Sequence, residues 1–161
     1  AEKARVAGED IFAACPEVED VFAKINAKFD IKPENTQIGS MIYAVKPGDG
    51  SAREQAASCQ KVLGGFANIA KEYATKRYRS NLINWGMLPF IYEEEELPFK
   101  NGDYIFVKDI KKSVENKIDT IKAYVVGDEM KEFELHLGKL TDAEREIIVK
   151  GCLINYYRSQ M

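Results

Sequence analysis

A glycine-containing turn between an apolar run and a helix-like segment limits what this chain can fold into more than any other feature. Residues 41–45 are apolar and suit a strand, residues 48–54 read Gly-Asp-Gly-Ser-Ala-Arg-Glu, and small residues follow. This order predicts a strand, a turn and a helix start. A helix start aims unpaired N–H groups and a positive dipole end back at the turn. The stretch therefore predicts an α/β unit whose turn can bind an anion.

Ser51 and Arg53 are the side chains of this turn that can act on a bound anion. A hydroxyl and a planar cation at a helix start can both face a carboxylate or a phosphate. The same residues also allow a purely structural interpretation. Ser51 and Glu54 have the spacing of a capping box, in which the hydroxyl and the carboxylate bind free amides at the helix start. From the residues alone, both interpretations stay open.

Three well-known kinds of site do not fit the turn. A dinucleotide fingerprint needs a third glycine where Arg53 stands. A phosphate loop of the Walker type needs a Gly-Lys-Ser/Thr sequence, which is absent. A Ser-His-acid triad could use only His136, the single histidine, and the Gly-x-Ser-x-Gly elbow is missing. The residues themselves therefore indicate an anion-binding serine turn without naming its reaction.

Further motifs follow the turn in a fixed order. They are Leu63-Gly64-Gly65, Asn81-Leu82, Gly86-Met87-Leu88-Pro89 and, near the end, Gly151-Cys152-Leu153-Ile154-Asn155. Together with the turn they resemble the C-terminal swivelling domain of the aconitase family. In that family the turn typically has the sequence Gly-Glu-Gly-Ser-Ser-Arg-Glu-His-Ala-Ala. The resemblance covers residues 41–90 closely and the rest of the chain loosely.

The resemblance implies a fold and a set of site residues. The fold would be α/β, the layered β/β/α swivelling domain of the aconitase and isopropylmalate isomerase small-subunit type. By position, Ser51 matches the family's catalytic base and Arg53 matches an arginine that binds a substrate carboxylate. Gly50 and Ala52 fall at substrate-binding positions of the turn. Ala52 replaces a serine and keeps only its backbone amide, and Gln55 replaces the usual histidine, so these departures bear on the substrate rather than the fold.

The resemblance also implies a cofactor and partners that lie outside this chain. A [4Fe-4S] cluster would be held by other aconitase domains, of the same or of a partner chain, and the substrate would be a small polycarboxylate. Removing a proton from carbon next to a carboxylate needs a base stronger than a solvated carboxylate. A serine alkoxide is strong enough where backbone donors and nearby positive charge stabilise it. No residue of this chain is expected to bind the metal.

Length and composition set the remaining limits. With 161 residues we expect one swivelling domain over residues 1–161, an excised C-terminal part of a larger enzyme. The net charge of −3 provides no general attraction to nucleic acid or to an anionic membrane, and no apolar run is long enough to span a bilayer. Cys15, Cys59 and Cys152 are widely separated and odd in number, which predicts reduced, buried thiols and a cytoplasmic setting.

Hydrophobic periodicity predicts the other elements, although residues 1–14 carry no clear signal. Helices are expected from Pro16 to about Phe29, over residues 53–62, along a face from Ala74 to Trp85, and as one closing helix with a Thr141–Glu144 capping box and a stripe of Ile148, Cys152 and Tyr156. Strands are expected at residues 41–45, 66–69, 88–90, 104–108, 118–126 and 132–137, the last two joined as a hairpin at Gly127-Asp128.

The other charged residues and the single histidine are expected to be solvent-exposed or structural. Lys76, Arg77 and Arg79 are expected to form a solvated helix face, and the acidic run at residues 93–96 a solvated loop. His136 is expected to be structural, because no second histidine or cysteine cluster accompanies it.

The function that these observations predict is that of an aconitase-like hydro-lyase domain. It would help to dehydrate and rehydrate a citrate- or isocitrate-like hydroxy polycarboxylate, and would be inactive alone. One alternative is a separate small subunit of the isopropylmalate-isomerase type. Another is a non-catalytic, RNA-binding relative of aconitase, against which the acidic charge balance argues.

Overall fold

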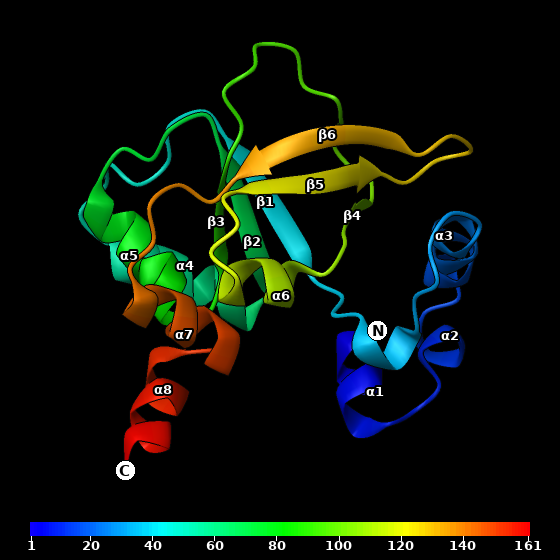
Figure 1. The fold of residues 1–161 in the computed structure, drawn as a ribbon, viewed down its shortest axis with the longest axis horizontal. Helices are drawn as coiled ribbons and strands as arrows, with labels where there is room; N and C mark the ends of the chain where they lie inside the picture. The colour runs from blue at the N-terminus through cyan, green and yellow to red at the C-terminus, as the bar shows by residue number, and fades with distance from the viewer. The chain divides into compact units, whose positions relative to one another are not determined.

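The computed structural model describes all 161 residues (Figure 1). The chain divides into two compact units, each assembled from three segments of the sequence. One unit comprises Ala1–Gly39, Glu96–Lys108 and Lys122–Phe133, and the other comprises Ser40–Glu95, Asp109–Ile121 and Glu134–Met161. The serine turn, defined from here on as residues 48–52, lies in the second unit.

The strands form one mixed, six-stranded sheet in the order β1-β2-β3-β6-β5-β4. Neighbours β1, β2 and β3 pair in parallel, whereas β3 with β6 and β4 with β5 pair antiparallel. This sheet with its helices confirms the expected α/β class. The bounds of the strands are β1 Ser40–Ala44, β2 Gly65–Ala70, β3 Leu88–Ile91, β4 Ile105–Val107, β5 Thr120–Val125 and β6 Lys131–His136.

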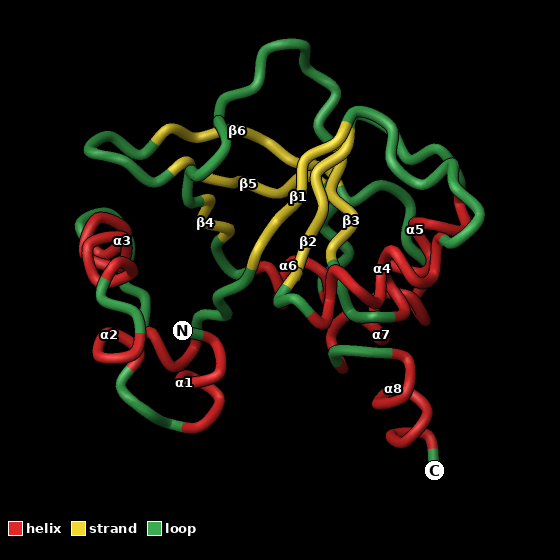
Figure 2. The backbone as a smooth tube through the Cα atoms, turned by 180° about the vertical axis from the view of Figure 1, so that it is seen from behind, coloured by secondary structure: helices red, strands yellow, loops and turns green.

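Two helices connect the parallel strands and place the serine turn. Helix α4 (Arg53–Val62) joins β1 to β2, and α5 (Lys76–Asn84) joins β2 to β3. Both cover the same face of these strands, as Figure 2 shows from behind, and they bury a core of Ala57, Tyr78, Leu82 and Met87. Because the carboxyl ends of parallel strands meet at one edge, the loops after β1 and β2 come together there. The predicted bounds of α4 are confirmed.

The last part of the chain differs from the prediction. The Thr141–Glu144 capping box is confirmed at the start of α7 (Asp142–Lys150). A single closing helix is wrong, because Gly151 adopts φ 91° and ends α7, and α8 (Leu153–Gln160) begins after it. The residue that α7 buries is Ile147 rather than Ile148. Helix α6 (Ile110–Glu115) was not predicted.

The first unit contains three N-terminal helices. The helix expected from Pro16 is confirmed as α3 (Glu17–Asn26), which buries Val18, Phe22 and Ile25. Before it lie α1 (Glu2–Ala7) and α2 (Ile11–Ala14), and after it a single 3₁₀ turn, η1 (Pro33–Asn35), none of which the periodicity predicted. Two small cores hold the unit together, one around Ile11, Val18 and Phe22, the other around Ile25, Phe106 and Tyr124.

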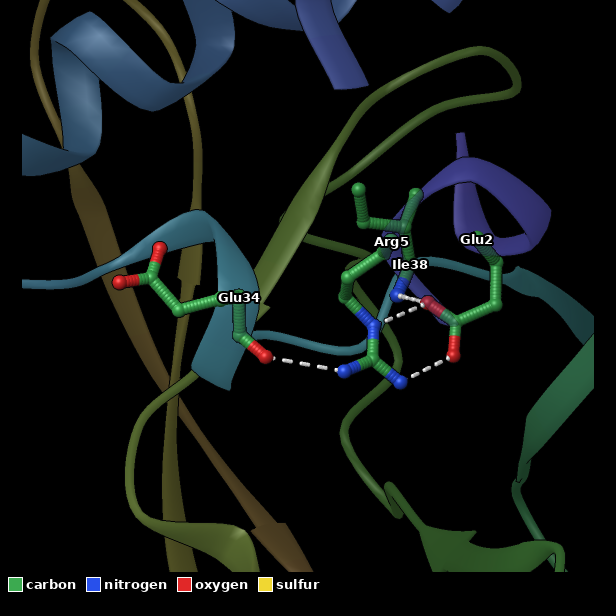
Figure 3. A network of polar contacts seen from close by, with 4 residues as sticks. All are labelled: Glu2, Arg5, Glu34 and Ile38. Atoms are coloured by element: carbon green, nitrogen blue, oxygen red, sulfur yellow. Dashed lines mark hydrogen bonds and ion pairs between the residues drawn. The ribbon is translucent and has the colours of Figure 1, made fainter. Parts of the chain in front are cut away.

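A polar network attaches α1 to the segment before β1 (Figure 3). Arg5 donates from Nε and Nη2 to the Glu2 carboxylate, at 2.8 and 2.6 Å, and from Nη1 to the Glu34 carbonyl at 3.0 Å. The same carboxylate accepts a hydrogen bond from the Ile38 amide at 2.9 Å. This charge-assisted network gives a short helix the tertiary support that its own hydrogen bonds do not supply. Nowhere in the fold does a helix combine the length and apolar character needed to cross a membrane.

Candidate functional site

The serine turn starts at a glycine that no other residue could replace without strain. Gly48 has φ 99°, in the region that favours glycine. A Cβ atom built on Gly48 would also overlap the ring of Tyr78, the third residue of α5. Gly50 differs, because it has no positive φ and open space surrounds it. The backbone therefore requires the first glycine, while the second remains exposed at the expected substrate-binding position.

The loop that carries the turn lies beside the loop after β2. The amide of Glu72 donates to the carbonyl of Val45 at 3.1 Å, and the amide of Ala74 donates to the carbonyl of Pro47 at 2.9 Å. The exposed pair of Lys46 and Glu72, 2.7 Å apart, adds little, because solvent screens it. The two backbone hydrogen bonds thus bring residues that are distant in sequence to the edge where β1 and β2 end.

Ser51 does not cap the helix, so the structural interpretation of the turn is wrong. Ala52 is the N-cap of α4, and it makes no side-chain capping hydrogen bond. Glu54 is therefore the second residue of the helix, whereas a capping box needs the acid at the third position after a serine N-cap. The Ser51 side chain is exposed. The hydroxyl is available to a ligand at the amino end of α4.

Arg53 carries a polar atom that the protein leaves unsatisfied. It is the first residue of α4 and is half-buried. Its Nε is buried and has no hydrogen-bond partner. A buried donor without a partner is unfavourable, and an anion at the uncapped amino end of α4 would satisfy it together with the free amides there. Ala52 and Gln55, the departures from the family pattern, are both exposed beside this position.

A buried polar network, which the sequence did not reveal, lies beneath the site. Gln60 of α4 donates to the side-chain oxygen of Asn68 in β2, and Asn68 donates to the hydroxyl of Tyr78 at 3.0 Å. Asn68 is 2% exposed, so these bonds compensate for the burial of its side chain. Burial raises the pKa of Tyr78, although the hydrogen bond from Asn68 opposes the shift. An asparagine inside a strand of small and apolar residues was the only signal of this network.

The three basic residues of α5, Lys76, Arg77 and Arg79, do not share one environment. Lys76 and Arg77 are exposed, as expected for a solvated face. Arg79 is not solvated in this way, because its Nη2 donates to the carbonyls of Leu137 and Lys139, at 2.9 and 3.0 Å. It therefore holds the segment after β6 against α5 instead of contributing a free charge.

The titratable and sulfur-containing side chains do not gather into a candidate metal site. No group of three His, Cys, Asp or Glu side chains could hold an ion. His136 is the last residue of β6, and its Nδ1 lies 3.5 Å from a carboxylate oxygen of Asp119. All three cysteines are free. The expectation of buried thiols is wrong, because Cys59 is exposed on α4 and Cys15 and Cys152 are only partly buried.

Comparison with known proteins assigns the family. The family described as Aconitase C-terminal domain matches residues 18–95. A methanogen homoaconitase small subunit from Methanocaldococcus jannaschii is 36% identical over 132 residues, which are 80% of this chain and 67% of the relative. The chain belongs to the aconitase family. The resemblance inferred from the motifs is thereby confirmed.

Other aconitase relatives agree with this assignment. A homoaconitase small subunit from Thermus thermophilus is 35% identical over 86 residues, which are 52% of this chain and 50% of that relative. A crystal structure of 3-isopropylmalate dehydratase from Methanocaldococcus jannaschii matches with a TM-score of 0.53 and 32% identity, covering 80% of this chain and 68% of the other. The serine turn and Arg53 lie inside the residues that the family match covers.

Proposed function

We propose that this chain is the swivelling domain of an aconitase-type hydro-lyase that dehydrates and rehydrates a small hydroxy polycarboxylate. The family membership supports the reaction class. Two relatives are named as homoaconitase small subunits and a third as a 3-isopropylmalate dehydratase, which favours a small-subunit arrangement with a separate cluster-bearing chain. The observation that carries the proposal is the buried, unpartnered Nε of Arg53 at the uncapped start of α4.

In this proposal Ser51 acts as the base and Arg53 binds the substrate. The guanidinium of Arg53 binds a substrate carboxylate through parallel hydrogen bonds, for which its planar fork is suited. The Ser51 oxygen, as alkoxide, takes a proton from the carbon next to a carboxylate. The electron pair of that C–H bond forms the C=C bond, and hydroxide leaves the neighbouring carbon. The proton taken up by Ser51 and this hydroxide together account for the water that the substrate loses, and release of the proton regenerates the alkoxide. The free amides of α4 and the Arg53 charge would stabilise the alkoxide.

The [4Fe-4S] cluster of the family belongs to the partner domains in this proposal. No set of side chains in this chain has the number and arrangement that a metal centre needs. The exposed serine turn, at the edge of the sheet where β1 and β2 end, is then the surface that meets the substrate on the partner.

The test is the turnover of Ser51→Ala in the complete enzyme, assembled with its partner domain and cluster. Because Ser51 is not a cap, we expect the melting temperature to stay unchanged. We expect kcat to fall by several orders of magnitude, because no neighbouring group replaces a lost base. Ser51→Asp should be equally inactive, since a carboxylate is a much weaker base than an alkoxide and repels an anionic substrate.

Ser58→Ala is the matched control for this test. Ser58 lies on the same helix, and its hydroxyl donates to the Gln55 carbonyl at 3.1 Å rather than facing the turn. This variant should keep wild-type turnover. Near-normal kcat in Ser51→Ala would rule out Ser51 as the base and move that role to another domain.

A further inference from the structure

We propose that Thr75 is the positioning residue that holds the serine turn in its working conformation. This inference rests on the proposed role of Ser51. Thr75 is the N-cap of α5, lies outside the serine turn, and belongs to none of the motifs of the sequence analysis. Its position depends on the pairing of the loops after β1 and β2, which bring together residues 27 positions apart.

One hydroxyl group of Thr75 joins two elements. Its Oγ1 donates to the carbonyl of Gly48 at 3.0 Å and accepts from the amide of Tyr78 at 3.1 Å. A hydroxyl has one proton to donate and lone pairs to accept with, so both bonds form at once. The first turn of α5 and the first residue of the serine turn are therefore fixed to the same atom.

Tyr78 supports the same residue from a second direction. Its ring packs so closely on Gly48 that a Cβ atom there would overlap it. The ring has little freedom to withdraw, because the buried amide of Asn68 donates to its hydroxyl at 3.0 Å. Gly48 is thus held at its carbonyl by Thr75 and at its α-carbon by Tyr78.

The Thr75 bond is the last anchor before the proposed base. Backbone hydrogen bonds from Glu72 and Ala74 hold Val45 and Pro47. Beyond Gly48, residues 49–51 make no hydrogen bond until α4 begins. The place of Ser51 is therefore set by Gly48 on one side and by α4 on the other. Arg53, in contrast, is placed by α4 itself, whose Ala57 is fully buried.

This difference predicts a split between the kinetic parameters. Loss of the Thr75 bond should displace Ser51 while Arg53 keeps its place on α4. Turnover should then fall, whereas substrate binding changes little. A misplacement of a reacting group by 1 Å costs on the order of 100-fold in rate, which sets the scale of the effect.

The experiment measures kcat and KM of Thr75→Val and Thr75→Ser in the complete enzyme with its partner domain and cluster. Valine keeps the shape and removes the hydroxyl, so we expect kcat to fall by about 100-fold with KM changed much less. Serine keeps both hydrogen bonds, and we expect kcat within about threefold of wild type. A Thr75→Val enzyme with wild-type kcat would overturn the inference.

Thr141→Val is the matched control. Thr141 caps α7 in the same way, accepting from the amide of Glu144 at 3.2 Å, but it does not contact the serine turn. Both valine variants lose a threonine cap and should show a similar fall in melting temperature. Only Thr75→Val should lose turnover. If Thr75→Val and Thr141→Val changed kcat equally, Thr75 would be a helix cap and not a positioning residue.

Thr75→Asp separates the two bonds if the valine variant does not fold. Aspartate is a good N-cap and can accept from the amide of Tyr78, but an ionised carboxylate cannot donate to the carbonyl of Gly48. We expect a stable enzyme with reduced kcat, and wild-type kcat would contradict the inference. If Ser51→Ala turned over normally, the proposed function itself would fail. If Ser51→Ala were inactive and Thr75→Asp normal, only the role of Thr75 would fail.

Discussion

At the scale of single residues, Arg53 has a buried donor that no group of the protein satisfies. A buried donor without a partner destabilises a protein by about 1–3 kcal/mol, more for a charged group. Arg53 keeps such a donor at Nε, on the first residue of a helix whose amino end has no side-chain cap. A bound carboxylate would remove that penalty and would interact favourably with the helix dipole. Under the proposed function, the cost in the free protein would thereby contribute to the binding of an anionic substrate.

Arg53→Lys should lower kcat/KM in the complete enzyme by about 10- to 100-fold, the equivalent of losing a hydrogen bond to a charged group. Lysine keeps the charge but lacks the planar pair of donors. The measurement is steady-state kinetics beside thermal melting, which should not change. Arg77→Lys, at an exposed position of α5, is the control and should behave as wild type. Unchanged kcat/KM in Arg53→Lys would show that this side chain does not hold the substrate.

At the scale of elements, the loop before α5 is tied to the neighbouring strand by Tyr73. The Tyr73 hydroxyl donates to the carbonyl of Phe90 in β3 at 2.9 Å. Burial raises the pKa of Tyr73 far above its usual value of 10.0, and the nearby Tyr78 adds to the shift while Arg79 opposes it. The folded protein therefore keeps this proton when the unfolded chain would release it.

The free energy of unfolding should accordingly fall as the pH rises above about 10. Below the ordinary pKa of tyrosine both states hold the proton, so no effect appears there. Above it only the unfolded state ionises, which for one group changes stability by up to about 1.4 kcal/mol per pH unit. Urea midpoints from about pH 8 to about pH 11 test this.

Tyr73→Phe should be less stable at neutral pH, because its hydrogen bond is lost, but should depend less on pH in the alkaline range. Tyr157→Phe, on the exposed side of α8, is the control and should keep the wild-type dependence. An alkaline slope equal to wild type in Tyr73→Phe would contradict the assignment.

At the scale of the whole molecule, the residues of the candidate site lie in one of the two units. The serine turn, Arg53, Thr75 and the buried Asn68 all belong to the second unit, Ser40–Glu95 with its two later segments. The three cysteines lie on α4 and at positions 15 and 152 without forming a group that could hold a metal. Under the proposed function, a partner would supply the cluster.

The purified chain should be folded, contain no stoichiometric iron or sulfide, and show no hydro-lyase activity by itself. Adding the partner domain with its cluster should restore activity. Iron and sulfide analysis and an activity assay, with and without the partner, are the measurements. A stoichiometric iron–sulfur cluster in the chain alone, after anaerobic reconstitution, would contradict the proposal that the partner binds the cluster.

Sequence patterns that depend on residues close together in the chain predicted much of this fold. Helix α4 ends where the periodicity ends at Val62, and Gly64, with φ 92°, reverses the chain into β2 as expected for a glycine after a helix. The strands β1 to β3 were predicted because their apolar runs are long enough to distinguish from turns. The short helices α1, α2 and α6 were not predicted, since helices of one or two turns rely on contacts such as those between Arg5 and Glu34.

The sequence by itself determined the α/β class, the order of strand, turn and helix, the family, and Ser51 and Arg53 as the candidate site residues. Those conclusions rest on residue type and spacing along a local stretch of chain. Only the tertiary structure decided that Ser51 is not a cap, that Arg79 holds a distant segment, and that Thr75 reaches Gly48. A cap shifts when a helix starts one residue later, and a hydrogen bond across 27 residues exists only after parallel strands have brought two loops together.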